Sequence, residues 1–508
     1  MNSQQTHKRP AWVRNAGRLG VGFQAILAGV SVAVALPGCA QARARFILFL
    51  PVMKFEPHNE PPIKPQVEEA FHEAELEHER SEAQRRRLWP RAALVGASAG
   101  LLAVAFRSAA TEGDILRTFL IRWAHHFGVL GCLIPALFGA ICAGLGAYLV
   151  QKFAPEAAGS GIPHLQAVLH GWKTLSPRRI LPVKFAGGAL AMAAGLAVGR
   201  EGPTLQMSGA MAALIASRTG ATELERRSLL AAGAGAGLAA AFNAPLAGML
   251  FVLEEMQRDF SPSVFTAGFL ACIAGNAVTH FLTGTASAFT VPTLAAPDVK
   301  ALPLFALSGA VAGVLGVAFN RGLIRVLDWT LPFSHWPRGL FAAMAGFGVG
   351  ALAFFHPNLV GAGHFLSEQA LDGRLLLGAI PLLFVARFTL TQGSYATGVA
   401  GGFFAPLLCL GAILGLGCGL ACHAVFPGID ARVFAVVGMA AYFASVVRAP
   451  LTGIVLIAEM TGDYTLLLPL FVASFAAYGV AEGLREMPIY ETLLERSLLP
   501  GERALGAN

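Results

Sequence analysis

The chain has 508 residues, of which 55% are hydrophobic and only 13% are charged. Soluble proteins carry about 25% charged residues, so this composition excludes an ordinary soluble domain and indicates a chain whose solvent is lipid. The formal net charge of +7 would suggest a nucleic-acid partner in a soluble protein, but here the Lys and Arg residues concentrate outside the apolar runs. We therefore expect no nucleic-acid partner.

The first 52 residues combine basic residues with an apolar stretch that ends at Cys39. They resemble a secretory signal with a lipoprotein-like cysteine. A cleaved signal would place the basic cluster Arg85–Arg87 outside the cell, against the rule that basic loops stay in the cytoplasm. The alternative hypothesis is that translation begins at Met53, so that 53–90 is a cytosolic segment with a charged surface helix. A peptide of the purified protein that maps before Met53 would exclude this start.

Apolar stretches recur from about Ala92 to Leu484, and a full span of the hydrocarbon core takes roughly 20 apolar residues. Several stretches are shorter or are broken by Gly and Pro, as at 185–199, and the chain contains 58 glycines. Close helix packing in lipid explains many single glycines equally well. However, the backbone groups of a broken helix are tolerated only inside protein or beside a hydrated cavity. We expect an all-α polytopic membrane protein with tilted and broken helices around a polar pathway.

The membrane core contains an internal repeat. The G-x-x-x-P motif at 199–203 recurs 203 positions later at 402–406. The Ala-Pro-Leu motif at 244–248 recurs 205 positions later at 449–453. Duplicated halves whose helices break at matching positions predict a transport site at their interface, although a merely structural duplication remains open. The divisions expected are a first membrane half at 91–290, a second at 291–487 and a short tail at 488–508 that carries Tyr490.

Three motifs rich in Gly and Pro lie at 159–163, 199–203 and 401–406. Glycine permits unusual backbone angles and proline suits the first turn of a helix, so each motif predicts a helix start. A helix N-terminus binds anions through free N–H groups and a partial positive charge. Three such ends would replace the water around an anion without a fixed cation, and the Ser160 hydroxyl would add a donor. The supporting motif residues are Gly159, Gly161, Pro163, Gly199, Arg200, Gly202, Pro203, Gly401, Gly402 and Pro406.

Acidic residues inside the apolar core are the next candidates. Glu201 opens a predicted helix, and an acid within a span is a functional hypothesis by default. Its carboxylate could occupy the anion site and leave on protonation, because burial favours the neutral form. The alternative is a helix-capping acid paired with Arg200. Glu254 and Glu255 fit solvated charges at the end of a span equally well, although Glu254 has a counterpart 205 positions later in Glu459.

Other functions find little support in the sequence. The seven cysteines lie in apolar stretches and predict no disulfide framework. Cys418, Cys422 and His423 could be drawn as a metal cluster, but no second cluster supports it, and no metal or cofactor is expected. An intramembrane enzyme would need Ser160 as nucleophile, yet its motif is not G-x-S-x-G, and no H-E-x-x-H occurs. We expect no enzyme activity.

At these residues the sequence resembles the CLC family of chloride channels and chloride/proton exchangers. The motifs GSGIP, GREGP and GGFFAP stand in that family's order, and FNAPLAGMLFVLEEM at 242–256 is also similar to it. The resemblance covers about residues 90–495. It implies a homodimer with one anion pathway per subunit, and two halves of inverted topology built from tilted, partial helices.

The resemblance also implies roles for single residues. Ser160 and Tyr490 would offer hydroxyls to a central chloride, and the backbone N–H groups of Phe403 and Phe404 would offer amides. Glu201 matches the external gating glutamate, and Glu255 matches the internal proton-transfer glutamate of the exchangers. Chloride/proton antiport is therefore expected, with a passive, proton-gated channel of the voltage-gated type as the alternative. Relatives that prefer nitrate carry Pro at the serine position and fluoride exporters depart from both motifs, so chloride is expected here.

Two departures from the family pattern stand out. The N-terminal extension matches nothing in it, and the paired regulatory domains of many eukaryotic relatives are not expected after Leu484. Nucleotide control is then not expected either. The partners expected are chloride, protons, membrane lipid and a second copy of the chain, in a bacterial inner membrane with the N-terminus in the cytoplasm.

Overall fold

The computed structural model describes residues 65–498, apart from 259–261, 285–288, 290–293, 296 and 427. The predicted extension at 1–52 and the last residues of the predicted tail lie outside this part. The described residues form helices joined by short connections and contain no β-strand. This is the expected outcome for an Ala-, Leu- and Gly-rich chain in lipid, because a helix satisfies its own backbone hydrogen bonds.

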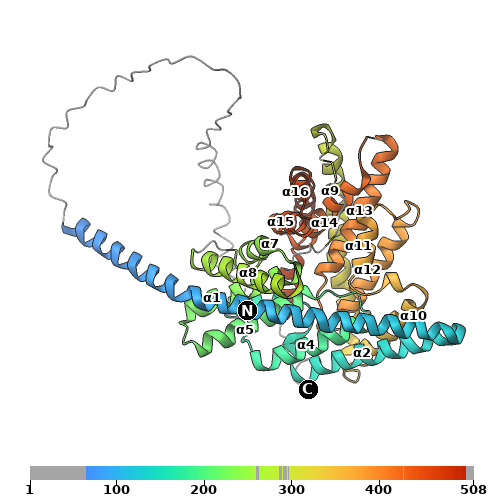
Figure 1. Cartoon of the computed structure of the whole chain (residues 1–508), viewed down its shortest axis with the longest axis horizontal. Coiled ribbons are helices and arrows are strands. Elements are labelled where there is room, and N and C mark those ends of the chain that lie inside the picture. Colours follow the sequence, from blue (N-terminus) through green and yellow to red (C-terminus); the bar gives the residue numbers. More distant parts are fainter. Residues whose placement is uncertain are drawn as a thin grey trace, which may run out of the picture. The chain divides into compact units, whose positions relative to one another are not determined.

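Up to Thr283 the described residues form eight α-helices in order along the sequence. Figure 1 colours this part of the chain from blue to yellow-green. These helices and the short turns between them are α1 (Pro65–Ala124), η2 (His125–Cys132), α2 (Leu133–Phe153), η3 (Pro155–Ala157), α3 (Ile162–Leu169), α4 (Pro177–Ala193), α5 (Glu201–Arg218), α6 (Glu223–Phe242), α7 (Pro245–Phe251), the π-helical turn η4 (Val252–Gln257) and α8 (Pro262–Thr283).

The remaining described residues contribute eight further helices that correspond in order to the first eight, and one last helix. They are η5 (Val299–Ala301), α9 (Leu302–Thr330), η6 (Leu331–His335), α10 (Leu340–Phe355), η7 (Pro357–Leu359), α11 (His364–Leu371), α12 (Ile380–Ala396), α13 (Phe404–Val425), α14 (Ala431–Val447), α15 (Pro450–Thr461), α16 (Leu467–Gly483) and α17 (Ile489–Leu498). The predicted boundary at 290/291 falls between α8 and α9.

Four described helical segments are long and apolar enough to cross a membrane, and several further apolar helices are shorter than a full span. The four are Arg86–Phe153, Val264–Thr283, Val299–Phe333 and Phe404–Ala424. The sequence predicted a charged surface helix within the segment 53–90. In the structure the described residues of this segment belong to α1, a single helix of 60 residues that continues into the first span and contains Pro90.

Corresponding helices in the two halves pack in corresponding ways. The backbone of α1 at Gly96 lies so close to Ala271 of α8 that a Cβ on the glycine would overlap the alanine carbonyl. The same holds for Gly309 of α9 and Ala473 of α16. The counterparts α2 and α10 lie side by side (Figure 1). Small residues allow these close approaches, which dispersion forces then stabilise in lipid.

The two halves also complete each other's helices. The carboxylate of Glu254 accepts hydrogen bonds from the backbone N–H groups of Leu451 (3.1 Å) and Thr452 (2.7 Å), at the start of α15. Its counterpart Glu459 accepts from the N–H groups of Leu246 (3.1 Å) and Ala247 (2.8 Å), at the start of α7. Such reciprocal caps are what a two-fold axis between the halves produces, and they satisfy N–H groups that a helix start leaves free.

Candidate functional site

The three motifs start helices, as the sequence predicted. Helix α3 begins at Ile162, α5 at Glu201 and α13 at Phe404. Gly159 and Gly161 have φ angles of +61° and +80°, which a side chain would strain. The first N–H groups of each helix have no acceptor inside the helix. Three sets of backbone donors are thus available.

The three helix starts meet at one place between the halves. Gly199 and Gly402 form an antiparallel bridge, with N···O distances of 2.6 and 3.1 Å. A Cβ built on Gly202 would lie 2.9 Å from Cβ of Ser160, and one built on Gly402 would lie 3.5 Å from the same atom. The antiparallel bridge shows that the corresponding segments run in opposite directions, as expected for inverted halves. The missing side chains leave Ser160 room between the other two motifs.

Glu201 occupies the first position of α5 and is 1% exposed. Neither of its carboxylate oxygens makes a hydrogen bond to a described residue. Arg200 and the backbone N–H of Ala405, in the first turn of α13, lie close enough to act on its charge. An acid held by a hydrogen-bonded pair with Arg200 does not fit this arrangement. The carboxylate instead faces the start of α13, where an anion would bind.

Tyr490 reaches the same region from α17. Its ring stacks on Phe403 with centroids 5.3 Å apart and an interplanar angle of 15°. The hydroxyl is buried and finds no hydrogen-bond partner among the described residues. Helix α17 packs against α3, which begins two residues after Ser160. A buried hydroxyl without a partner requires explanation, and a transported anion would satisfy it.

Glu255 is not the solvated charge that the sequence left open, because its side chain is 2% exposed. It belongs to the π-helical turn η4, a feature that is frequent at functional sites. Gln166 of α3 donates from Nε2 to the Glu255 backbone oxygen (3.0 Å) and to its Oε1 (3.1 Å). Tyr490 lies near enough to Glu201 and Glu255 for both charges to act on it. The tyrosine therefore lies within electrostatic range of both acids.

Sequence reasoning missed two buried cations that hold the loops before α3 and α11. The ammonium of Lys184 donates to the carbonyl oxygens of Ala157 (2.9 Å) and Gly159 (2.7 Å). In the second half, Nη1 of Arg387 donates to Leu359 (2.9 Å) and Gly361 (2.8 Å). Both side chains are fully buried. A cation inside an apolar run, Lys184 within 180–193 and Arg387 within 380–388, was the signal that could have found them.

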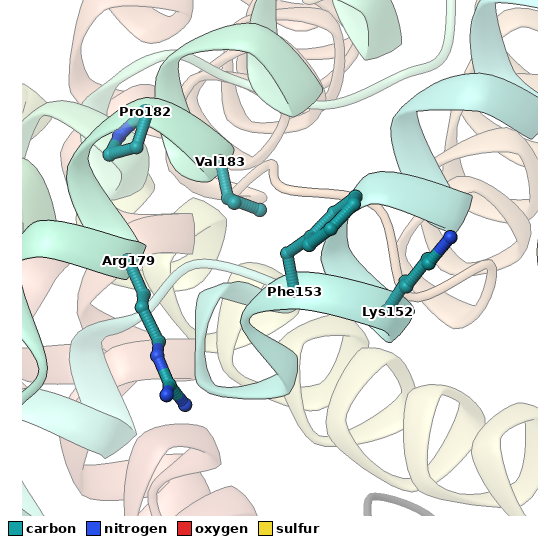
Figure 2. A pocket seen from close by; sticks show the side chains of 5 residues that line it. All are labelled: Lys152, Phe153, Arg179, Pro182 and Val183. Atoms are coloured by element: carbon teal, nitrogen blue, oxygen red, sulfur yellow. The ribbon is translucent and has the colours of Figure 1, made fainter.

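A cavity of 570 Å³ lies at the ends of α2 and α4, and it is lined by Lys152, Phe153, Arg179, Pro182 and Val183. In Figure 2 the Val183 and Phe153 side chains lie between Arg179 and Lys152, whose charged ends point in different directions. None of the predicted site residues lines it. The described residues also contain no group of three or more His, Cys, Asp or Glu that could hold a metal.

Known proteins are similar to this chain in both sequence and fold. The family model of the voltage gated chloride channel matches residues 138–482. The chain belongs to the CLC family. The H(+)/Cl(-) exchange transporter ClcA of Vibrio cholerae is 41% identical over 422 residues, which cover 80% of this chain and 88% of that protein. ClcA of Yersinia pestis is 39% identical, over 81% of this chain and 88% of its own length.

Solved CLC structures match the arrangement of helices. A slow cyanobacterial Cl-/H+ antiporter superposes with a TM-score of 0.78 at 35% identity and covers 81% of this chain and 98% of its own. A eukaryotic CLC transporter gives a TM-score of 0.68 at 27% identity, over 80% of this chain and 74% of its own. The resemblance seen in the motifs is confirmed, and so is the all-α membrane fold of two inverted CLC halves.

Proposed function

We propose that this CLC protein exchanges chloride for protons through a pathway gated by Glu201. The observation that carries the proposal is Glu255, a buried acid held by Gln166 on the helix that begins next to Ser160. A channel that only gates on protons needs Glu201 alone, whereas an exchanger needs a second acid to bring the proton. The related proteins at 41% and 39% identity are H(+)/Cl(-) exchange transporters. The proposed activity is transport, without catalysis.

In this mechanism chloride lies between the Ser160 and Tyr490 hydroxyls and the amides of Phe403 and Phe404. Backbone dipoles bind the anion firmly enough to strip its water but weakly enough to release it. The Glu201 carboxylate takes the anion's place at the start of α13 when no anion is there. Protonation of Glu201 removes its charge and frees the place for chloride.

The proton reaches Glu201 from Glu255, on the other side of Tyr490. Glu255 accepts a proton from the aqueous side and passes it toward Glu201, whose neutral side chain then leaves the anion site. Chloride and the Glu201 carboxylate compete for one place, and this competition couples the two flows in opposite directions. A ligand can bias such an equilibrium only through its different affinity for the two states.

Purified protein in lipid vesicles tests the proposal. A chloride gradient should drive protons uphill, and the absence of uphill movement would favour the passive channel. Glu255→Gln should abolish proton movement and leave chloride flux, because an amide cannot carry the proton. Glu201→Ala should give chloride flux that no longer depends on pH. Glu223→Gln, at an exposed acid, is the matched control and should behave as wild type.

We further propose a homodimer in which α8 and α16 contribute to the interface. Both helices carry a pair of stacked, partly exposed phenylalanines, Phe265 with Phe269 and Phe471 with Phe475. Light scattering of the detergent-solubilised protein should give twice the chain mass of 53.0 kDa. A mass of one chain would contradict the dimer.

The proposed location is a bacterial inner membrane with the N-terminus in the cytoplasm. Arg91, next to the basic cluster of α1, binds the Thr219 carbonyl (2.8 Å) and Glu225 (2.9 Å). The end of α5 and the start of α6 therefore lie on the side that the positive-inside rule assigns to the cytoplasm. A cysteine introduced at the exposed Ser217 should react with an impermeant maleimide only after cells are opened. Labelling of intact cells would invert the orientation.

A further inference from the structure

An ion pair next to Glu255 joins the end of η4 to α17. Arg258 follows the π-helical turn η4 with a φ angle of +53°, an uncommon conformation for a residue other than glycine. Its side chain is 52% exposed, and Nη1 pairs with Oε1 of Glu491 on α17. Glu491 directly follows Tyr490 in the sequence. The pair thus links the turn that carries the proton acid to the helix that carries the anion-site hydroxyl.

The second nitrogen of the same guanidinium points toward Glu255. Nη2 of Arg258 lies 3.9 Å from Oε2 of Glu255. That oxygen has no hydrogen-bond partner among the described residues, whereas Oε1 accepts from Gln166. One arginine therefore stands between a buried acid and a more exposed one, whose side chain is 28% exposed.

Among the residues that the structure describes, Arg258 is the one cation that acts on Glu255. Arg258, Glu491 and Glu254 are the charged residues that act on it, and Gln166 is its neutral hydrogen-bond partner. Glu254 is already engaged by the first N–H groups of α15. Tyr490 faces the region as a neutral hydroxyl. Arg258 is thus the cation that can change its pairing when the charge of Glu255 changes.

We propose that the Arg258–Glu491 pair sets the pH at which Glu255 exchanges protons with the cytoplasm. When Glu255 is ionised, Arg258 is drawn toward its free oxygen and stabilises the carboxylate. When Glu255 takes up a proton, Arg258 returns to Glu491. Arg258 and Glu491 are positioning residues in this scheme, which rests on the proposed role of Glu255.

The expected size of the effect follows from the geometry. A half-exposed charge near a buried one is partly screened, so the full interaction at about 4 Å in a dry interior does not apply. We expect the half-maximal pH to shift by about one unit, which is a tenfold change in the proton affinity of Glu255. The two partners should shift the half-maximal pH in opposite directions. Loss of the Arg258 cation disfavours ionised Glu255, whereas loss of Glu491 leaves Arg258 free to stabilise ionised Glu255.

Arg258→Gln and Glu491→Gln in lipid vesicles separate this role from a structural one. Proton-coupled chloride flux is measured against the pH of the side that faces Arg258, together with chloride flux in the absence of a proton gradient. Arg258→Gln should move the half-maximal pH upward by about one unit, and Glu491→Gln should move it downward. A pair that merely holds two helices together would give the same result from either substitution.

Two further variants keep the test decisive. Arg258→Lys retains the charge and should keep the wild-type pH profile. Arg227→Gln removes another exposed arginine that is paired with an acid, Glu223, and should shift nothing. Shifts in the same direction from Arg258→Gln and Glu491→Gln, or no shift from either, would overturn the inference. If Glu255→Gln keeps its proton coupling, the proposed role of Glu255 fails instead, so the two failures are distinguishable.

Discussion

The two halves of this protein share a backbone plan but differ in the chemistry placed on it. Before α3 the chain reads Gly159-Ser160-Gly161, and 202 positions later, before α11, it reads Gly361-Ala362-Gly363. All four glycines have positive φ angles, and the two helices that follow have eight residues each. A buried cation holds each loop by two carbonyls.

The residues proposed to act on the transported ions lie mainly in the first half. The positions of Ser160, Glu201 and Glu255 correspond to Ala362, Phe404 and Met460 in the second half. By contrast, the reciprocal caps Glu254 and Glu459 occur in both halves. Residues that build the fold are thus duplicated, whereas the hydroxyl and the two acids are not. The backbone is therefore symmetric, whereas the side chains proposed to act on ions lie mainly in the first half. The two halves enclose a single pathway, to which the second half contributes backbone amides.

The largest expected effect is on the buried cations. Lys184→Met and Arg387→Met should each lower the free energy of unfolding by about 3 kcal/mol, because each leaves two buried carbonyls without a donor. Unfolding in mixed detergent micelles measures this. Lys152→Met, at an exposed lysine, is the control and should change little. If only one of the two cations proves necessary, the loops are not equivalent.

The reciprocal caps should have a smaller and equal effect. Glu254→Ala and Glu459→Ala each remove charge-assisted hydrogen bonds at a helix start and should cost about 2 kcal/mol of stability. Glu255→Met, which copies Met460, should leave the unfolding free energy near that of wild type while it stops proton coupling. Unfolding and flux measurements on the same preparations compare the three. A large loss of stability in Glu255→Met would make this acid structural.

Exchanging the loop residues sharpens the comparison at the anion site. Ser160→Ala copies the second half and should weaken chloride binding by about fivefold, or about 1 kcal/mol, because one hydroxyl donor is lost. The reciprocal Ala362→Ser should leave the affinity unchanged. Titration calorimetry with chloride measures both. Equal effects of the two substitutions would mean that the anion contacts both loops.

The smallest effect concerns the helix caps of the counterparts α6 and α14. Thr222 caps α6 through the N–H of Glu225, and Asp430 caps α14 through the N–H of Arg432. Hydrogen bonds from Arg432 hold the pKa of Asp430 below its ordinary value. This cap therefore contributes above the unfolded pKa of about 3.9 and is lost as pH falls through the lower folded pKa.

Asp430→Asn should accordingly cost about 0.5 kcal/mol near pH 6 and nothing at a pH below the folded pKa of Asp430. Unfolding at several pH values checks this. A Thr222→Ala difference that titrates in the same acid range would mean that the pH dependence does not come from Asp430.

Much of the fold was predictable because Gly and Pro mark the ends of broken helices. Gly and Pro residues predicted the three helix starts and two of the motifs that recur in both halves. The third such motif, the loop at 361–363, was missed because Ala362 replaces the serine and no proline follows. Lys184, Arg387 and Gln166 were missed for another reason. Each lies among apolar neighbours in its helix, and only the fold shows which carbonyl or acid it meets.

The exchange of caps between α7 and α15 has a consequence for the making of this protein. The acid that completes α7 is synthesised 212 residues after Ala247, so the nascent first half enters the membrane with that helix start unfinished. Glu254, the acid that caps α15, is by contrast synthesised before α15. Neither half is a self-sufficient folding unit, and maturation of the chain has to end with the two halves closing on each other.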